Sequence, residues 1–501
     1  MFFRRLIATV VTVVAVMMLL MVTKVMALQT GPANWSVPFN LAGDVDFETW
    51  QPKIVADNEE NLHMVWLAWT GLDQPGRLIA NTVFYSYWDG SDWSRPVDII
   101  ATVGTTSLGS LDFVSTPDGR LLLAWESQGN AFLGQSSAWT AGDAKNWTTI
   151  PLGQGSNPRI AYDATTDNLY LTMSDTSRRK LELLRSSDLG QSWQSPTLLW
   201  STEDINRAIS NEQVQVDSNG NIHAVWAENT EEKSWLGEAI WRAVVSAETM
   251  EVSVQEVMRS SQAGDPTLGS PTMIFGSDGD AYLFWNNGVG SLTGRFYAFS
   301  QDNGTTWTEP TPLFPGLSGQ TGPAGLAIDS AGVLHLATAA DGDGYGYGVV
   351  RYATMRDGAW SPYYTLPAAQ FVGEHPSLAV TNGNQLHLVW TQFQKTADSS
   401  FGRVSHSLLK LDTPFVAPAG FVEAPSSDVG FLTPTPTPSV ALHDQATGKS
   451  TETRATSLPL SDTGSPSPGL NSGAVVLISV LPALGLVLVV FASQRRRNVS
   501  R

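Results

Sequence analysis

The chain contains no cysteine among its 501 residues, and cationic side chains are scarce. Without cysteine there is no disulfide bond, no thiolate metal site and no thiol nucleophile. Lysine and arginine together number 29 against 47 aspartates and glutamates, which gives a formal net charge of −18 at pH 7. This acidic balance argues against nucleic acid as a partner and predicts a soluble, self-repelling surface. Neither a cofactor nor a bound metal is expected.

Long apolar runs occur only near the two ends of the chain. Residues 1–27 are predicted to be a signal peptide, because Arg4 and Arg5 precede an apolar run and Val25-Met26-Ala27 offers a cleavage site. An uncleaved anchor helix is the alternative, since the run is about long enough to span a bilayer. Residues 473–493 are predicted to form a transmembrane helix, and residues 494–501 a basic cytoplasmic tail.

The segment before the second apolar run is rich in Pro, Thr and Ser. Residues 412–472 cannot bury a core and are predicted to form an extended, disordered stalk. Within it, Leu458–Gly464 is similar to a sortase sorting signal with two additional residues, and the stalk interpretation is favoured. The arginines behind the predicted span favour a single-pass protein of the cell membrane, with the region before the stalk outside the cell.

Between the two ends, a repeated pattern of short strands predicts the fold. Each unit opens with an apolar strand, often after x-Pro, followed by a tight turn and a second strand that usually ends in Trp. The first strands begin near residues 51, 110, 157, 211, 270, 323 and 375. A period of about fifty residues is typical of four-stranded propeller blades. Residues 33–411 are therefore predicted to form one all-β, seven-bladed β-propeller of antiparallel blades, with a six-bladed ring as the alternative.

The last unit lacks a fourth strand of its own. The segment Trp35-Ser36-Val37-Pro38-Phe39 matches the fourth-strand pattern and precedes the first unit. We expect it to pair with the strand at residues 404–410, since closing the ring in this way removes an exposed edge.

Two turns between third and fourth strands carry one motif, Ser-x-Asp-x-Gly-x-Ser/Thr-Trp. Its aspartate folds back onto backbone N–H groups and its glycine takes a positive φ, as in a hairpin tip. The residues at the fixed positions that we assign a structural role are Ser186, Asp188, Gly190 and Trp193 in the first copy and Ser300, Asp302, Gly304 and Trp307 in the second.

These two copies resemble the Asp-box, or BNR, repeat of the sialidase-like β-propellers. The resemblance implies a propeller whose Asp boxes lie away from the functional face. Sialidases have six blades and an early Phe/Tyr-Arg-Ile-Pro motif. The string most similar to that motif, Pro158-Arg159-Ile160, falls on an ordinary repeat strand where Lys53 holds the equivalent place. No catalytic residue is therefore carried over from the family.

The candidate functional residues follow from topology. Loops between second and third strands share one face with the connections between blades, so polar residues at these positions are expected to line the propeller mouth. Arginines there can hold a carboxylate or sulfate. The candidates are Arg77, Arg295, Arg351 and Arg403, with Glu126, Asp175, Glu228, Asn286 and Gln392. A solvated rim of ion pairs is the alternative role for the arginines.

Two other sets of residues suggest metal or acid–base chemistry at first sight. Four histidines occupy the same place in the second strands of four units, which favours packing over metal binding: His63, His223, His335 and His387. The run at residues 341–348 resembles a calcium loop only weakly, because it lacks a third acidic ligand and the distal Glu.

The leading functional hypothesis is a cell-surface module that binds a glycan or protein ligand at the propeller mouth. An exo-glycosidase of sialidase type and a scaffold without a small ligand are the alternatives.

Overall fold

A computed structural model describes residues 34–41, 48–74, 77–102, 106–233, 236–260, 267–276, 278–288, 293–320, 322–341, 348–356, 358–366, 372–395 and 400–417. These residues are almost entirely β-strand, with short 3-10 helices at Ala144–Asn146 (η1) and Glu231–Lys233 (η2). None of their helices is long and apolar enough to cross a membrane. The expected signal peptide, stalk, transmembrane helix and basic tail lie outside the described residues, apart from the first residues of the stalk, up to residue 417.

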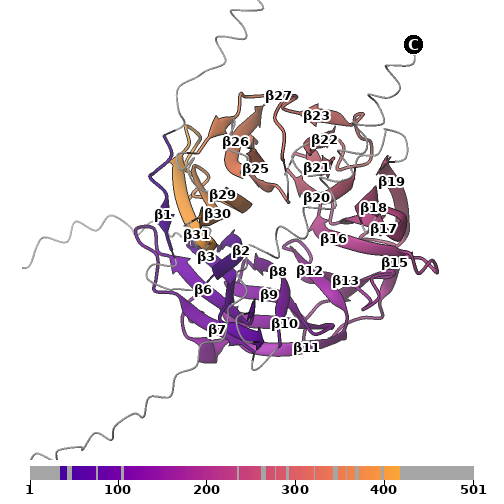
Figure 1. Ribbon diagram of the computed structural model, residues 1–501, viewed down its shortest axis with the longest axis horizontal. Helices are drawn as coiled ribbons and strands as arrows, with labels where there is room; N and C mark the ends of the chain where they lie inside the picture. Colours follow the sequence, from indigo (N-terminus) through magenta and orange to yellow (C-terminus); the bar gives the residue numbers. More distant parts are fainter. Residues whose placement is uncertain are drawn as a thin grey trace, which may run out of the picture. The chain divides into compact units, whose positions relative to one another are not determined.

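Seven four-stranded antiparallel sheets form a ring, with the first strand of each sheet on the inside (Figure 1). The predicted seven-bladed propeller is confirmed, and the six-bladed alternative is wrong. Blades 1 to 3, from the inside outwards, are β2 (Glu48–Ala56), β3 (Leu62–Trp69), β6 (Thr82–Trp88) and β7 (Val97–Ala101); β8 (Leu108–Ser115), β9 (Arg120–Ser127), β10 (Asn130–Ser137) and β11 (Thr148–Gln154); and β12 (Ser156–Asp163), β13 (Asn168–Ser174), β14 (Lys180–Ser186) and β15 (Thr197–Ser201).

Blades 4 to 6 follow the same order. They are β16 (Arg207–Val216), β17 (Ile222–Thr230), β18 (Leu236–Val245) and β19 (Val252–Arg259); β20 (Leu268–Phe275), β21 (Ala281–Asn287), β22 (Gly294–Ser300) and β23 (Thr311–Leu313); and β24 (Gly325–Ile328), β25 (Leu334–Asp341), β26 (Gly348–Arg356) and β27 (Ala359–Trp360), with β28 (Tyr364–Thr365) also on β26. A separate hairpin in the loop after β3 joins β4 (Gly71–Gln74) to β5 (Arg77–Ile79).

Blade 7 is built from both ends of the described chain. Its strands β29 (Val372–Thr381), β30 (Gln385–Lys395) and β31 (Ser400–Lys410) are completed by β1 (Phe39–Asn40). Phe39 pairs with His406, and Trp35 forms a bridge to Leu409. The expected closure by the N-terminal segment is therefore confirmed.

The hydrophobic core lies between blades rather than inside one sheet. Buried apolar side chains form seven clusters, and each joins two neighbouring blades. The second strands are buried along most of their length, and β13 along all of it, because a blade packs against a neighbour on both faces. A blade therefore has no core of its own and depends on the ring for its stability.

Both Asp boxes lie at the junction between two blades. In the first box, Ser186 Oγ accepts a hydrogen bond from the Gly190 N–H at 2.7 Å, and Asp188 Oδ1 accepts one from the Ser192 N–H at 2.8 Å. Hydrogen bonds from the Ser192 hydroxyl and backbone lower the pKa of Asp188 to about 2. A Cβ at Gly190 would meet Leu133 of blade 2 at 2.3 Å, so only glycine fits there.

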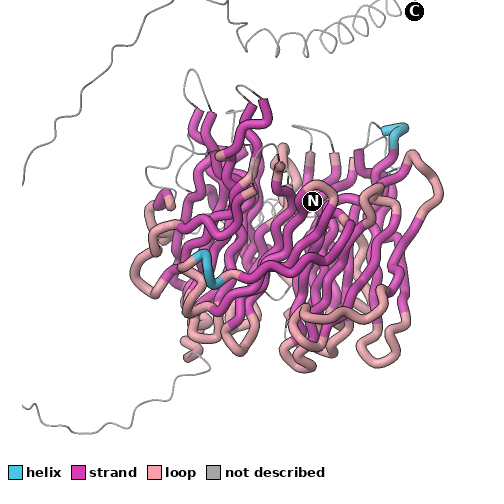
Figure 2. Tube along the Cα trace, turned by 90° about the horizontal axis from the view of Figure 1, so that it is seen from below, coloured by secondary structure: helices cyan, strands magenta, loops and turns pink. Residues whose placement is uncertain are grey.

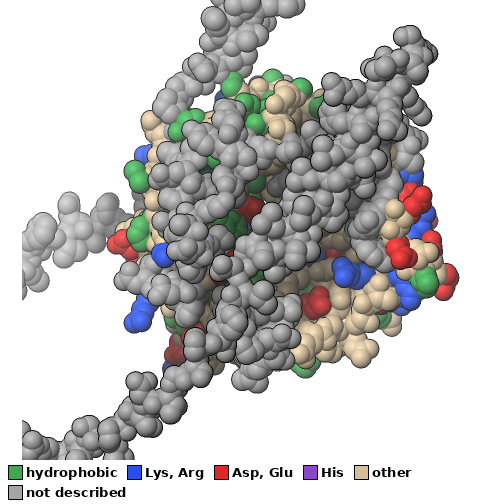
Figure 3. Space-filling model, viewed as in Figure 1, with side chains coloured by type: hydrophobic (Ala, Val, Ile, Leu, Met, Phe, Trp, Pro, Cys, Tyr) green, Lys and Arg blue, Asp and Glu red, His purple; other side chains and the backbone are tan. Residues whose placement is uncertain are grey.

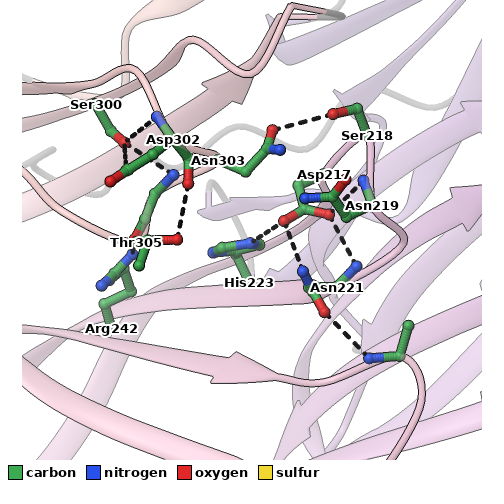
Figure 4. A network of polar contacts seen from close by, with 12 residues as sticks. Asp217, Ser218, Asn219, Asn221, His223, Arg242, Ser300, Asp302, Asn303 and Thr305 are labelled. Atoms are coloured by element: carbon green, nitrogen blue, oxygen red, sulfur yellow. Dashed lines mark hydrogen bonds and ion pairs between the residues drawn. The ribbon is translucent and has the colours of Figure 1, made fainter.

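The second box packs in the same way on blade 4 (Figure 4). Asn303 Oδ1 accepts a hydrogen bond from Ser218 Oγ at 3.0 Å, and the Arg242 guanidinium donates to the Gly304 carbonyl. Arg242 also lies 5.1 Å from the ring centre of Trp307. Burial lowers the pKa of Arg242 to about 10. The box is thus a clamp between blades.

The strands run between two faces of the disc (Figure 2). The turns between first and second strands and the Asp boxes share one face, as the contact between Ser218 and Asn303 shows. The mouth of the propeller lies on the other face, where second strands end.

Candidate functional site

A bulge in the first strand of six of the seven blades directs side chains into the central channel. In blade 1, Trp50 pairs with Leu67 and Lys53 pairs with Val65, so Gln51 and Pro52 together oppose one residue. The first bulge residue has a positive φ of 49° to 55° in six blades: Gln51, Ser110, Asn157, Asn211, Ser270 and His375. Gly322 takes the same place in blade 6, with a φ of 69°. The bulge explains the x-Pro pattern of the repeat. Its second residue makes no ladder hydrogen bond, so proline, which has no N–H, fits there.

The residue that follows each bulge lies on the channel wall, and most of these side chains bind the adjacent blade. Asp112 Oδ2 accepts the Ile160 N–H at 3.0 Å, and Gln213 Oε1 accepts the Met273 N–H at 3.3 Å. Thr272 and Ser377 accept N–H groups of blades 6 and 1 at 3.3 and 3.4 Å. These bonds satisfy inward-facing amides and join the blades around the channel.

Arg159 makes a similar connection on both sides. Its Nε donates to the Glu212 carbonyl of blade 4 at 2.8 Å, and its Nη1 donates to the Leu111 carbonyl of blade 2 at 3.0 Å. This guanidinium ties three blades together and places a positive charge in the channel wall.

Lys53 is the exception among the charged residues of this ring. It lines the channel cavity of about 330 Å³ and donates no hydrogen bond to any residue that the structure describes. Burial lowers the pKa of Lys53; the charge of Asp112 acts in the opposite direction, and that of Arg159 in the same direction. Since its ammonium has three donors and no acceptor among the described residues, Lys53 is available to an anionic group.

His375 stands next to Lys53 on the first bulge position of blade 7. Its ring packs on Trp50 with centroids 4.5 Å apart. Burial, together with the charge of Lys53, lowers the pKa of His375 to about 4, so the imidazole is neutral at physiological pH. Its Nδ1 lies 3.9 Å from Glu374 Oε2, beyond hydrogen-bond distance.

The channel carboxylates lie on separate blades and have structural partners. Asp112 belongs to blade 2, and Glu212 to blade 4. Glu212 is 1% exposed and accepts a hydrogen bond from Ser174 Oγ at 2.9 Å, while burial raises its pKa. No tyrosine is among the described residues that line the channel. The described part of the channel therefore contains no carboxyl–tyrosine pair.

Of the predicted arginines, Arg295, Arg351 and Arg403, whose side chains the structure describes, do not line this cavity. Arg295 is buried and donates to Thr338 Oγ1 at 3.0 Å and to the Gly322 carbonyl at 2.8 Å. Burial lowers its pKa to about 9. Arg351 donates to Thr365 Oγ1 and lies 5.1 Å from the ring centre of Tyr363. Arg403 pairs with Gln392 across β30 and β31.

For Arg77, the structure describes only the backbone, which belongs to β5. The side chains of Arg295 and Arg351 thus already have protein partners within blades 5 and 6. A ligand-binding role for the four arginines stays a prediction.

The other predicted polar residues also have partners in the protein. Glu126 Oε2 accepts the N–H of the bulge residue Asn157 at 3.0 Å, and Asn286 Nδ2 donates to the Gly322 carbonyl at 3.1 Å. Asp175 caps the turn after β13 by accepting the Arg179 N–H at 2.7 Å. Three of the five thus support a bulge or a turn.

Of the remaining two, Gln392 Oε1 accepts a hydrogen bond from Ser405 Oγ. Glu228 accepts the Trp241 indole N–H at 2.6 Å and contacts Arg207. Acidic and basic side chains gather over this part of blade 4 (right side of Figure 3). The ligand-binding role assigned to these residues from sequence likewise stays a prediction.

The four repeat histidines lie buried at the turn between first and second strands. His63, His223 and His335 place Nε2 3.0 to 3.1 Å from Asp57, Asp217 and Asp329. His387 instead contacts Thr381 and His406. Among the described residues no group of three His, Asp or Glu side chains is arranged to hold a metal ion. Residues 342–347 of the calcium-like run lie outside the described part.

The sequence analysis did not assign a role to the channel residues. Lys53 and Arg159 were noted only as equivalent positions of an ordinary repeat strand. The signal that could have found them is a charged residue at a repeat position where the last three units carry Thr, Ala and Ser.

Comparisons with known proteins identify the fold. No family model and no curated protein sequence matches the chain. Among solved structures, an ulvan lyase of a new polysaccharide lyase family, bound to -[GlcA(1-4)Rha3S]-, matches with a TM-score of 0.51 and 10% identity over 72% of this chain and 94% of the lyase. A protein of unknown function from Dyadobacter fermentans matches with a TM-score of 0.48 and 14% identity over 75% and 98%. A Hadza microbial sialidase matches with a TM-score of 0.42 and 13% identity over 75% and 68%. The match to the ulvan lyase therefore shows the β-propeller fold.

Proposed function

We propose that the protein binds an anionic glycan in the mouth of the propeller, with Lys53 holding an acidic group of the saccharide. The observation that carries this proposal is an ammonium group in the channel wall that has no hydrogen-bond acceptor in the described protein. The chain as a whole carries a formal charge of −18, so a locally cationic channel is needed to hold an anion. Lys53 and Arg159 supply two positive charges, and Asp112 offsets one of them.

An ulvan lyase whose fold matches with a TM-score of 0.51 supports the same ligand chemistry. The ulvan lyase holds a saccharide that contains a uronic acid and a sulfated sugar. In this chain, polar side chains around the channel can form hydrogen bonds with the hydroxyls of such a saccharide, namely those of Gln51, Asn211 and Ser270.

Binding is favoured over hydrolysis by the placement of the acids. A glycosidase of retaining or inverting type needs two carboxyl groups facing one bond, about 5 to 10 Å apart. Asp112 and Glu212 belong to different blades, and both accept hydrogen bonds from the protein. A fluorogenic sialoside tests the sialidase alternative, and turnover by the wild-type protein would contradict the binding assignment.

Eliminative cleavage is a second candidate function, favoured by the neutral imidazole of His375 beside the Lys53 ammonium. A neutral imidazole can remove the proton next to a uronate carboxylate, and a nearby ammonium stabilises the negative charge that develops. The electron pair then forms a C=C bond as the glycosidic oxygen leaves. Formation of an unsaturated uronate by the wild-type protein, lost in His375→Ala, would assign this activity instead of binding alone.

Replacement of Lys53 tests the proposed site. Lys53→Gln should weaken binding to an anionic polysaccharide such as alginate or a sulfated rhamnan by about ten- to a hundredfold, since a charge-assisted hydrogen bond contributes about 1.5–3 kcal/mol. Lys410→Gln is the matched control, because Lys410 is exposed at the end of β31 and its replacement changes the net charge equally. Dissociation constants from calorimetry at one salt concentration give the comparison. Equal binding by Lys53→Gln and Lys410→Gln would exclude Lys53 from the site.

The location of the protein is part of the proposal. A signal peptide, a stalk and a terminal span, all read from sequence, support display of the propeller outside a cell membrane. Brief protease treatment of intact cells should release a fragment that contains the propeller, and full protection of the chain would contradict the orientation.

A further inference from the structure

A groove between blades 1 and 2 carries an exposed tryptophan that the proposed function does not use. The groove has a volume of about 730 Å³ and is lined by Tyr87, Arg95, Trp139, Asp143 and Asn146. Its walls are the connections between third and fourth strands of both blades. Since these connections lie on the Asp-box face, the groove is on the side of the propeller opposite the mouth.

Trp139 is exposed but held in place. Its side chain is 61% exposed, whereas most of the tryptophans in the described residues are buried or half-buried. The indole N–H donates to Glu59 Oε2 at 3.2 Å. A Cβ at Gly119 would lie 2.5 Å from the ring, so the ring edge rests directly on the backbone of this glycine. The indole face is thus fixed before any ligand arrives, which lowers the entropy cost of binding.

The opposite wall supplies a second aromatic ring and polar groups. Tyr87 at the end of β6 is 38% exposed, and the groove also presents the exposed Arg95. Asn146 is held by a hydrogen bond from its Nδ2 to the Thr140 carbonyl at 3.0 Å. Aromatic faces with a few convergent polar groups, in a volume within the range of about 300–1,000 Å³, are the usual composition of small-molecule sites.

The charged residues around the groove indicate whether a neutral or an anionic ligand is favoured. Lys145 is paired with Asp143 at 2.5 Å, and the buried Asp57 contacts His63 at 3.0 Å. Glu59 lies beside Trp139 and offsets the charge of Arg95. There is no excess of positive charge, so the groove does not favour a carboxylate or sulfate.

We propose that this groove, which we call the Trp139 groove, is a second saccharide site and binds a neutral polysaccharide chain. One face of a pyranose ring presents C–H groups that pack on a flat indole, and its edge presents hydroxyls that reach Arg95, Asp143 and Asn146. The site is independent of the channel, because it lies on the other face and shares no residue with it. A propeller with both sites can hold an anionic and a neutral glycan at once.

Affinity electrophoresis of the full chain in nonionic detergent tests the Trp139 groove. The probes are soluble neutral polysaccharides, namely galactomannan, mixed-linkage β-glucan and arabinoxylan, with alginate as the anionic comparison. We expect at least one neutral polysaccharide to retard the wild-type protein, and Trp139→Ala to weaken that binding about tenfold or more. Tyr87→Ala, on the other wall, should weaken the same binding.

Matched variants separate this site from the channel and from general effects of an exposed ring. Phe415→Ala removes an aromatic side chain that is 62% exposed and outside the groove, and should bind as the wild type does. Lys53→Gln should keep neutral-polysaccharide binding even if alginate binding is lost. The proposal is overturned if no neutral polysaccharide retards the wild type, or if Trp139→Ala and Tyr87→Ala both migrate with it.

Discussion

Left-handed backbone at non-glycine residues recurs around the central channel, at the same position of six blades. Such a conformation costs about 1–3 kcal/mol at a residue that has a Cβ, and it persists only where its surroundings hold it. Gln51, Ser110 and Ser270 are not residue types that tolerate it as asparagine and histidine do, yet they share it with Asn157 and Asn211. The side chain of Glu126 supports one bulge by accepting the Asn157 N–H. Because the bulge recurs in six blades, it is the feature that turns side chains into the channel.

Two glycines with nearly equal φ, Gly304 of the second Asp box and Gly358 between β26 and β27, allow backbone strain to be separated from crowding. Gly304 and Gly358 have φ of 73° and 74°, but a Cβ at Gly304 would lie 3.0 Å from Arg242 and 3.1 Å from Trp307, whereas Gly358 has open space. Gly358→Ala should therefore cost about 1–2 kcal/mol through strain alone. Gly304→Ala should cost about 2–4 kcal/mol, because overpacking adds to the same strain. Urea unfolding of both variants measures the difference, and equal losses would show that the box does not clamp the neighbouring blade.

Among the strands, β30 and β31 of the closing blade contain a buried histidine pair. His387 Nδ1 lies 3.1 Å from His406 Nε2, and the Trp93 indole of blade 1 donates to His406 Nδ1 at 3.1 Å. Burial lowers the pKa of both histidines to about 3, and for His387 the neighbouring His406 adds to the effect. Both rings are thus neutral hydrogen-bonding groups that connect blade 7 to blade 1.

This pair predicts a loss of stability in mild acid. Between about pH 6.5 and pH 3 the unfolded chain binds a proton at each histidine and the folded chain does not, so the free energy of unfolding falls as the pH falls. The slope is about 1.4 kcal/mol per pH unit for each histidine. His406→Gln removes one titrating group and should flatten the pH dependence by about that amount between pH 6 and pH 4.

The measurement is the free energy of unfolding in urea at several pH values for the wild type and His406→Gln. The pH range in which the histidines lower the stability is separate from the range in which the Asp-box aspartates do so. Asp188 and Asp302, with pKa values of about 2, contribute stability that is lost only as the pH falls below the ordinary aspartate value of 3.8. Parallel curves for the two proteins between pH 6 and pH 4 would contradict a neutral buried pair.

At the scale of the molecule, stability depends on closure of the ring. Each hydrophobic cluster is shared by two blades, so an open ring exposes one face of blade 7 and one of blade 1. The N-terminal segment prevents this: Ser36 N–H donates to the Leu408 carbonyl at 2.8 Å, and Trp35 packs edge-to-face on Tyr352 at 5.1 Å. Residues at the two ends of the described chain therefore hold one blade together.

Trp35→Ala should destabilise the whole propeller. Trp35 is 8% exposed, and truncating a buried tryptophan costs about 3–5 kcal/mol. Val37→Ala is the control in the same segment, because Val37 is 86% exposed and its truncation should change the stability by less than about 0.5 kcal/mol. Thermal unfolding followed by tryptophan fluorescence compares the two, and similar midpoints would show that the ring does not need this strand.

The sequence by itself determined the ring, because local patterns repeat with its geometry. Apolar second strands, x-Pro at the bulges, the Gly of each Asp box and the Trp35 signature are properties of short segments, so they predict seven blades and their closure without knowledge of long-range contacts. It did not determine the channel or the Trp139 groove. Which side chains meet across blades, and which lack a protein partner, depends on segments far apart in the chain. Asp112 and Ile160 are brought together only by the ring, as are Trp139 and Glu59. Lys53 looks like an ordinary strand residue in the sequence, and only the bulge places it in a channel wall where Asp112, Arg159 and Gln213 have protein partners.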